Sequence, residues 1–261
     1  MSGVLNSTPE IYFLRILNYN KQKQMKLICL TYAGGNRYSY RNLMQYIDKT
    51  IDFVTLELPG RGGRRIESLI ENLDDLTDDL YNQIQPFLVS DYMIYGHSMG
   101  AMLGNLLIHK LNDNLKPLPI FFLATGCSSP KKRHLRRKLH HLNNIAFHEA
   151  LKHLGGMPDE VIENEELLGY VTPILRNDIK AIETYVYKER SKYDVPIMLI
   201  SGAQEGLNEE DVINWQDETS ANFKYSFLSG GHFFIDDHPK YIADIMNYQF
   251  IRGVRTIKDK H

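Results

Sequence analysis

The stretch YGHSMGAML, residues 95–103, decides the fold of this chain. In it, Ser98 lies between Gly96 and Gly100 and follows a short apolar run, DYMIY. A serine in the pattern G-x-S-x-G, between a strand and a helix, is typical of a nucleophile on a sharp turn. The flanking glycines leave room for its strained backbone, and the next amide, that of Met99, can stabilise an oxyanion from the helix N-terminus. The alternative interpretation is an ordinary turn from strand to helix.

Short apolar runs rich in β-branched and aromatic residues recur on both sides of this turn. They are nearly continuous rather than alternating, which is typical of strands covered on both faces of a parallel sheet. Helical patterns lie between them, as in 73–87, where leucines recur every three or four residues, and in the segments that begin at Met99 and Pro239. The predicted strands are 11–17, 26–32, 52–58, 91–97, 118–125, 196–201 and 223–229.

Strand and helix alternate along the whole chain except over residues 128–192, where helical patterns occur without a convincing strand. Such an insertion between two strands of an open sheet is expected over the strand ends, as a cap or lid. We predict an α/β fold with a mostly parallel sheet flanked by helices. Residues 1–127 and 193–250 would form the core, 128–192 a helical lid and 251–261 a polar, frayed tail.

Composition narrows the class of protein. The chain has 261 residues, 43% of them hydrophobic, which suits one large α/β domain. A formal net charge of -2 gives no reason to expect a nucleic-acid partner. No signal peptide is recognised, and the longest apolar runs are shorter than the roughly 20 residues of a membrane span. Cys29 and Cys127 lie in apolar runs and are expected to be reduced, so we predict a cytoplasmic protein. For the oligomeric state, a monomer is the default prediction.

A serine nucleophile of this kind is followed in the chain by an acid and then by a histidine. His232, in LSGGHFFIDDHP, comes just after a predicted strand, and two glycines let the backbone turn back toward Ser98. His238 is the fallback. His97 is expected to point to the opposite side of the turn as a structural residue. The histidines in the insertion lack a metal-ligand pattern, so no metal site is expected.

The acid is expected in the turn PIMLISGAQEGLNEED, where Glu205 is the first carboxylate. Aspartate is more usual at such a position, but glutamate carries the same charge on one more methylene group. Asp211, in the predicted helix that follows, is the alternative. The second oxyanion donor is expected in the glycine-containing loop LTYAGGNRYSY, and the amide of Ala33 is the candidate. This loop lacks the spacing and the lysine of a phosphate-binding Walker motif.

The chain resembles the type II thioesterases of nonribosomal peptide and polyketide assembly lines, which belong to the α/β-hydrolase superfamily. The resemblance extends from about residue 26 to about residue 250 and is most specific in the insertion. It implies Ser98 as nucleophile, His232 as base, and Met99 and Ala33 as oxyanion donors. Glu205 stands where the family has aspartate. The matching motifs are TYAGGN, LELPGRGGR, YGHSMGAML, GGHFFI and, in the insertion, HLGGMPDEVIENEELLGYVTPILRNDIKAIETYVY.

The resemblance also implies a substrate, an acyl group on the phosphopantetheine arm of a carrier protein, and no cofactor of the enzyme itself. Carrier surfaces are generally acidic, and the lid begins with the basic stretch KKRHLRRK, residues 131–138. Arg133, Arg136 and Arg137 would share one helical face there and could dock the carrier. The alternative interpretation of these arginines is a merely solvated surface.

Editing of carrier domains, by removal of wrong or stalled acyl groups, is the function that we predict. A fatty acyl-carrier thioesterase of the medium-chain type, or a carboxylesterase, is the second interpretation. The third is a hydrolase fold retained for binding, with a defective triad, which only the glutamate at position 205 encourages.

Overall fold

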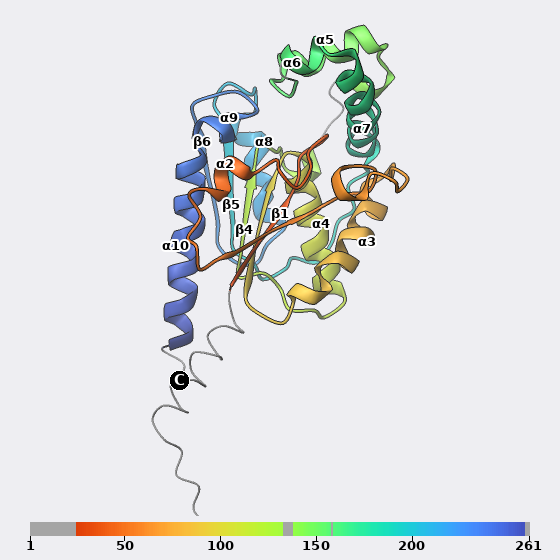
Figure 1. Ribbon diagram of the computed structural model, residues 1–261. Helices are drawn as coiled ribbons and strands as arrows, with labels where there is room; N and C mark the ends of the chain where they lie inside the picture. The colour runs from red at the N-terminus through yellow and green to blue at the C-terminus, as the bar shows by residue number, and fades with distance from the viewer. Residues whose placement is uncertain (1–24, 133–137, 158, 259–261) are drawn as a thin grey trace, which may run out of the picture.

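A six-stranded parallel sheet forms the centre of the molecule (Figure 1). The computed structural model describes residues 25–132, 138–157 and 159–258. The strand order is β2-β1-β3-β4-β5-β6, and every neighbouring pair is parallel. This confirms the predicted fold class. The strands are β1 (Lys26–Leu30), β2 (Asp52–Leu56), β3 (Tyr92–His97), β4 (Phe121–Thr125), β5 (Ile197–Gly202) and β6 (Phe223–Leu228).

Two hydrophobic cores, one on each face of the sheet, explain why the strands have continuous apolar sequences. In β1, Ile28 and Leu30 belong to one buried cluster, whereas Leu27 and Cys29 belong to the other. Because successive side chains of a strand point to opposite faces, a strand covered on both faces needs apolar residues at every position. Cys29 and Cys127 are both buried, and within the described residues they form no disulfide.

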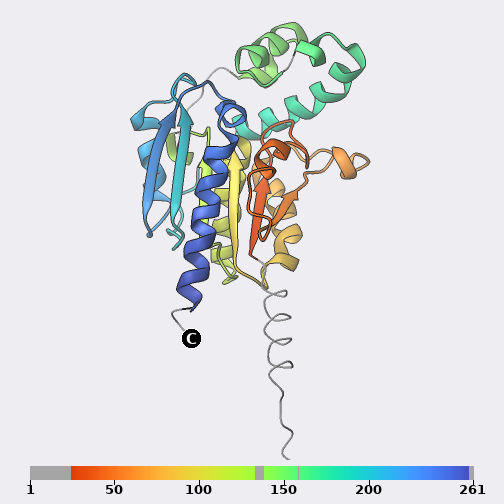
Figure 2. The ribbon, with the colours of Figure 1, turned by 60° about the vertical axis from the view of Figure 1, so that its left-hand side comes forward.

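Helices cover both faces of this sheet (Figures 1 and 2). Helices α3 (Leu73–Ile84) and α4 (Met99–Asp113) pack on one face, and the short α8 (Glu209–Ile213) joins them there. Helices α2 (Arg41–Met44), α9 (Phe234–Asp237) and α10 (Pro239–Lys258) cover the other. Helix α3 begins after Asn72, whose side chain accepts the Asp75 N–H at 2.8 Å, so it has a conventional N-cap.

Residues 128–192 are here called the lid insertion, and its described residues stand above the carboxyl ends of the strands (Figure 2). The insertion contains α5 (Asn144–His153), α6 (Asp159–Ile162) and α7 (Glu165–Thr184), together with 3₁₀ turns at Pro130–Lys132 and Leu139–His141. In its described residues, no strand joins the sheet. The helices share a small core of their own, formed by Phe147, Leu151, Met157, Leu175 and Ile179. The sequence predicts that the insertion lies over the strand ends, and its described residues do lie there. Its function as a lid stays a prediction.

The end of the chain differs from the prediction of a polar tail over 251–261. Helix α10 continues to Lys258, so the prediction is wrong over most of that range. No proline interrupts residues 251–258, and proline is the residue that most strongly ends a helix. The predicted strand 11–17 lies outside the described residues.

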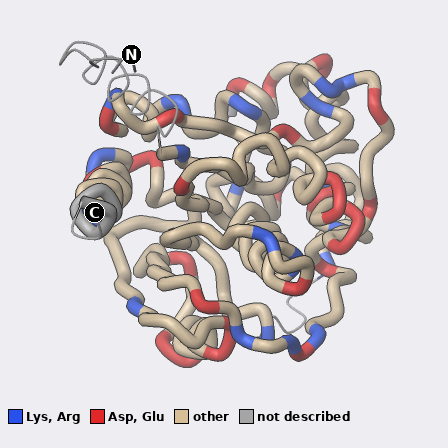
Figure 3. Tube along the Cα trace, turned by 90° about the horizontal axis from the view of Figure 1, so that it is seen from below, with Lys and Arg blue, Asp and Glu red and all other residues tan. Residues whose placement is uncertain are grey.

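Charged residues of both signs are interspersed at the end of the molecule opposite the lid insertion (Figure 3). None of the helices in the described part of the chain is long and apolar enough to cross a bilayer.

Candidate active site

Ser98 lies on the turn between β3 and α4, at the carboxyl edge of the sheet. Its backbone has a φ of 54° and a ψ of -113°, a strained conformation for a residue with a side chain. A Cβ on Gly96 would lie 2.2 Å from the Gly100 carbonyl oxygen, and one on Gly100 would lie 2.0 Å from the Leu30 carbonyl oxygen. Close backbone contacts therefore require both glycines, and the strained serine favours the nucleophile interpretation over an ordinary turn.

His232 follows β6 on a loop that bends back toward Ser98. Gly230 in this loop has a φ of 117°. A Cβ on Gly202, the last residue of β5, would lie 2.3 Å from the Gly231 carbonyl oxygen, so the loop packs directly on the end of its neighbouring strand. The His232 Nε2 lies 3.0 Å from the Ser98 Oγ. The imidazole is therefore placed to accept the serine proton.

Glu205 lies in the turn after β5 and contacts the other side of the imidazole. Its Oε2 lies 2.7 Å from the His232 Nδ1, and its Oε1 accepts the Gly202 N–H at 2.8 Å. Since an ionised carboxylate only accepts hydrogen bonds, Nδ1 carries the imidazole proton and Nε2 is left as the acceptor. The Glu205 side chain is only 2% exposed. The longer side chain thus reaches the histidine and is held by a backbone amide.

The two fallback candidates lie elsewhere. Asp211 accepts the Asn208 N–H at 3.0 Å, in the capping box that begins α8. The His238 Nε2 lies 3.1 Å from the Ser229 hydroxyl and 2.9 Å from the Ser229 carbonyl oxygen. The structure thus brings the three preferred side chains into one hydrogen-bonded chain; their catalytic roles stay predictions. Arg133, Arg136 and Arg137 lie outside the described residues.

Both predicted oxyanion donors lie at this edge of the sheet. Met99 is the first residue of α4, and the first amides of a helix have no carbonyl acceptor within it. In the described part of the chain, the Ala33 N–H has no hydrogen-bond partner. Ala33 also packs against the core cluster that contains Met99. Within the described residues, both amides thus lack an acceptor at this edge of the sheet, and their role as oxyanion donors stays a prediction.

The sequence predicts that His97 points to the opposite side of the turn, away from the site. The structure shows this expectation to be wrong. Its ring lies beside that of His232, with 4.9 Å between the centroids, because the loop after β6 folds over it. A Cβ on Gly126 would lie 2.4 Å from the His97 Cε1, so this glycine makes room for the ring. The His97 Nδ1 lies 3.0 Å from the Thr125 hydroxyl, and Nε2 is buried with no hydrogen-bond partner among the described residues. Burial, and to a lesser extent the neighbouring His232, hold the pKa of His97 well below its usual value.

The neutral state of His97 predicts a pH-dependent stability. Its usual pKa is 6.5. Below that pH the His97 imidazole is protonated in the unfolded chain but stays neutral in the folded chain. The free energy of unfolding therefore falls as the pH falls. One such group contributes about 1.4 kcal/mol per pH unit. We expect His97→Gln to remove this contribution, as measured by urea unfolding between about pH 7.5 and pH 5.5. If the free energy of unfolding depended on pH in the same way in wild type and in His97→Gln, the prediction would be contradicted.

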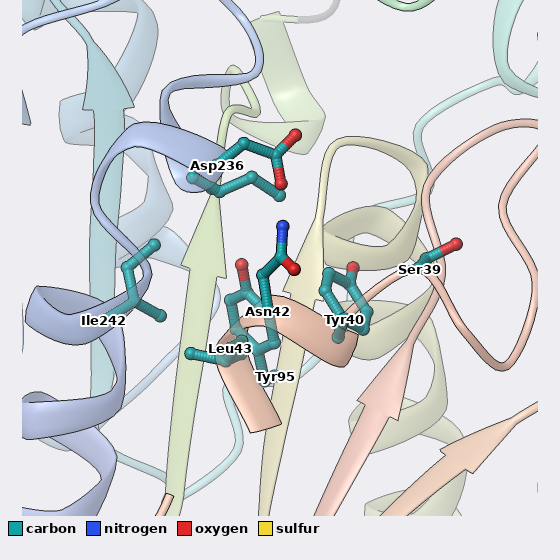
Figure 4. Close-up of a pocket in the computed structure, with 8 residues that line it drawn as sticks. Ser39, Tyr40, Asn42, Leu43, Tyr95, Asp236 and Ile242 are labelled. Atoms are coloured by element: carbon teal, nitrogen blue, oxygen red, sulfur yellow. The ribbon is translucent and has the colours of Figure 1, made fainter. Parts of the chain in front are cut away.

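A small cavity lies between α2, α9, α10 and β3 (Figure 4). Its volume is about 10 Å³, which is room for about one water molecule. It is too small for an acyl group, and we assign it no substrate. Within the described ranges, no three His, Cys, Asp or Glu side chains gather in a way that could hold a metal ion. The cavity is lined by Ser39, Tyr40, Asn42, Leu43, Tyr95, Ile235, Asp236 and Ile242.

Known proteins resemble this chain in sequence or in fold. The gramicidin S biosynthesis protein GrsT of Aneurinibacillus migulanus is 26% identical over 219 residues, which cover 84% of this chain and 86% of that protein. The structure of ClbQ from the colibactin NRPS/PKS pathway has a TM-score of 0.83 and 30% identity, and covers 90% of this chain and 100% of its own. The type II thioesterase BorB from the borrelidin biosynthetic cluster has a TM-score of 0.78 and 27% identity, with coverages of 85% and 91%.

The family assignment follows from the extent of these matches. A model of the thioesterase domain matches residues 25–250, which include the six strands of the described sheet and the whole range of the lid insertion. Because this match spans far more than half of the sequence, the chain belongs to the thioesterase family, enzymes that hydrolyse thioester bonds.

Proposed function

We propose that this protein is a type II editing thioesterase, which removes acyl groups from the phosphopantetheine arms of carrier proteins in nonribosomal peptide and polyketide biosynthesis. One observation carries the proposal: Ser98, His232 and Glu205 form a continuous hydrogen-bonded chain, with separations of 3.0 and 2.7 Å. Because these hydrogen bonds are all present, the triad gives no support to the interpretation of a binding protein with a defective triad. GrsT and ClbQ, named for gramicidin S biosynthesis and for the colibactin NRPS/PKS pathway, support the choice of pathway.

The reaction proceeds in two steps. As the Ser98 Oγ attacks the thioester carbonyl, the His232 Nε2 takes the serine proton. The oxyanion that forms accepts hydrogen bonds from the amides of Met99 and Ala33. When the intermediate collapses, the carbon–sulfur bond breaks and the imidazolium returns its proton to the departing sulfur. Water, deprotonated by His232, then attacks the acyl-serine, and the products are the free acid, the carrier thiol and regenerated Ser98.

A thioester suits this site chemically. A thiol has a pKa near 8.5, so a thiolate leaves far more easily than an alkoxide or an amide nitrogen. The phosphopantetheine belongs to the partner, so the enzyme needs no cofactor of its own. Docking of an acidic carrier by Arg133, Arg136 and Arg137 remains part of the proposal, as do a cytoplasmic location and a monomeric state.

The substrate class is tested with a panel of acylated carriers followed by intact mass. We expect wild-type protein to remove short acyl groups from phosphopantetheinyl carriers, with kcat/KM at least about tenfold above that for a p-nitrophenyl ester. Carriers incubated without the enzyme are the blank. A preference for long fatty acyl chains would instead indicate the fatty acyl-carrier interpretation. A preference for the ester would indicate a carboxylesterase.

A further inference from the structure

A buried carboxylate of the lid insertion holds the loop that carries Ala33. This segment, residues 31–37, is here called the oxyanion loop. Asp178, on α7, is completely buried, and its Oδ2 accepts the Gly34 N–H at 2.8 Å. The peptide group between Ala33 and Gly34 is therefore fixed in orientation. The amide one residue earlier, that of Ala33, stays unpaired within the described part of the chain.

Arg61 completes the contact from the loop after β2. Its Nη1 donates to the Asp178 Oδ2 at 2.5 Å, and its Nη2 donates to Oδ1 at 2.7 Å. The Arg61 side chain is only 3% exposed. A bidentate pair between buried partners fixes geometry as well as charge. The carboxylate is thus held in one orientation while it binds the Gly34 amide.

The oxyanion loop is also enclosed sterically. Gly34 has a φ of 75°, and a Cβ placed there would lie 2.4 Å from the Leu175 Cδ2 of α7. On the other side, a Cβ on Gly100 would meet the Leu30 carbonyl oxygen, so the loop begins directly against the start of α4. The loop is therefore packed between the helix that follows Ser98 and the main helix of the lid insertion.

The far end of the oxyanion loop has an anchor that does not involve the lid insertion. Glu57 accepts the Arg37 N–H at 3.2 Å through Oε1 and the Gly63 N–H at 2.7 Å through Oε2. This carboxylate ties the end of the loop to the segment that carries Arg61. The contacts with α7 are thus in the middle of the loop, where Gly34 donates to Asp178 and Ala33 packs against the core of the lid insertion.

We propose that Asp178 couples the position of the lid insertion to the oxyanion hole. With α7 seated as it is here, Asp178 holds the Gly34 amide and leaves the Ala33 amide directed for the oxyanion. A displacement of α7 withdraws the acceptor and frees the loop, so the oxyanion hole is complete only under a seated lid. Asp178 and Arg61 are positioning residues in this scheme. The inference rests on the proposed function, in which Ala33 is an oxyanion donor.

The test compares Asp178→Ala with Asp178→Asn. Loss of one oxyanion donor typically lowers kcat by about 10²–10³-fold, and we expect an effect of that size for Asp178→Ala, with little change in KM. Asp178→Asn keeps an acceptor for the Gly34 N–H and is expected to retain more of the activity. Glu218→Gln is the matched control, because Glu218 is also a buried carboxylate, and it accepts from Asn105 and His109, away from the loop.

Labelling with a fluorophosphonate separates positioning from folding. The reagent reacts with Ser98 and places a phosphoryl oxygen in the oxyanion hole. For Asp178→Ala we expect full final labelling at a rate reduced in parallel with kcat. Reduced final labelling, with kcat per labelled site within about threefold of wild type, would overturn the inference, because it indicates loss of folded protein only. Labelling needs no thioester, so failure of the carrier panel alone would reject the substrate and not the coupling.

Discussion

Replacing Ser98 with alanine is expected to lower kcat on acylated carriers by roughly six orders of magnitude, to a residual rate about 10³–10⁴-fold above the uncatalysed one. Without the hydroxyl, no acyl-enzyme can form. The variant also lacks the Ser98 Oγ, which lies 3.0 Å from the His232 Nε2 and supplies the proton that His232 accepts. The remaining amides can only polarise the carbonyl for direct attack by water. Intact-mass time courses of the acyl-carrier, with variant enzyme at stoichiometric concentration, measure the residual rate.

Ser229→Ala is the control for this experiment. Ser229 lies in the same loop as His232, but its hydroxyl contacts His238. This variant is expected to keep wild-type kcat. Residual activity of Ser98→Ala above about 1% of wild type would show that another group is the nucleophile.

Glu205→Gln is expected to lower kcat by about 10⁴-fold while the fold stays intact. The Gly202 N–H, which now donates to Oε1, would hold the amide oxygen of glutamine at that position. The amide nitrogen would then face the His232 Nδ1 and donate to it. This favours the tautomer with the proton on Nε2, which cannot accept the serine proton.

Steady-state kinetics and thermal unfolding of Glu205→Gln and Asp211→Asn test the assignment of the acid. Asp211→Asn removes a charge six residues away in the chain, from the capping box of α8, and should leave kcat unchanged. Glu205→Asp keeps the charge on a shorter side chain and should retain more activity than the glutamine variant. Equal kcat values for Glu205→Gln and wild type would remove Glu205 from the mechanism.

The features that the sequence predicted are local ones. Continuous apolar runs located the strands because the central strands are buried on both faces, as in β1. The glycines around Ser98 marked the turn because neighbouring backbone atoms leave no space for a Cβ. The order of serine, acid and histidine then restricted the choice of partners.

The remaining features depend on contacts between distant parts of the chain. Asp178 and Arg61 are 117 residues apart in sequence, and no periodicity shows that they pair. The place of His97 beside His232 depends on how the loop after β6 folds over the turn. The choice between Glu205 and Asp211 also needed the structure, because both carboxylates follow β5 closely. Chain-local patterns carry no information on such packing.

The strand order has a consequence for how the enzyme is made. From β3 onward, each newly synthesised strand adds to the same growing edge: β4 on β3, β5 on β4 and β6 on β5. A nascent chain can therefore extend the sheet in the order of translation. His232, which follows the last strand, leaves the ribosome after both of its partners. We expect an unfinished chain to carry an inert Ser98, so that hydrolysis begins only when the last strand has docked.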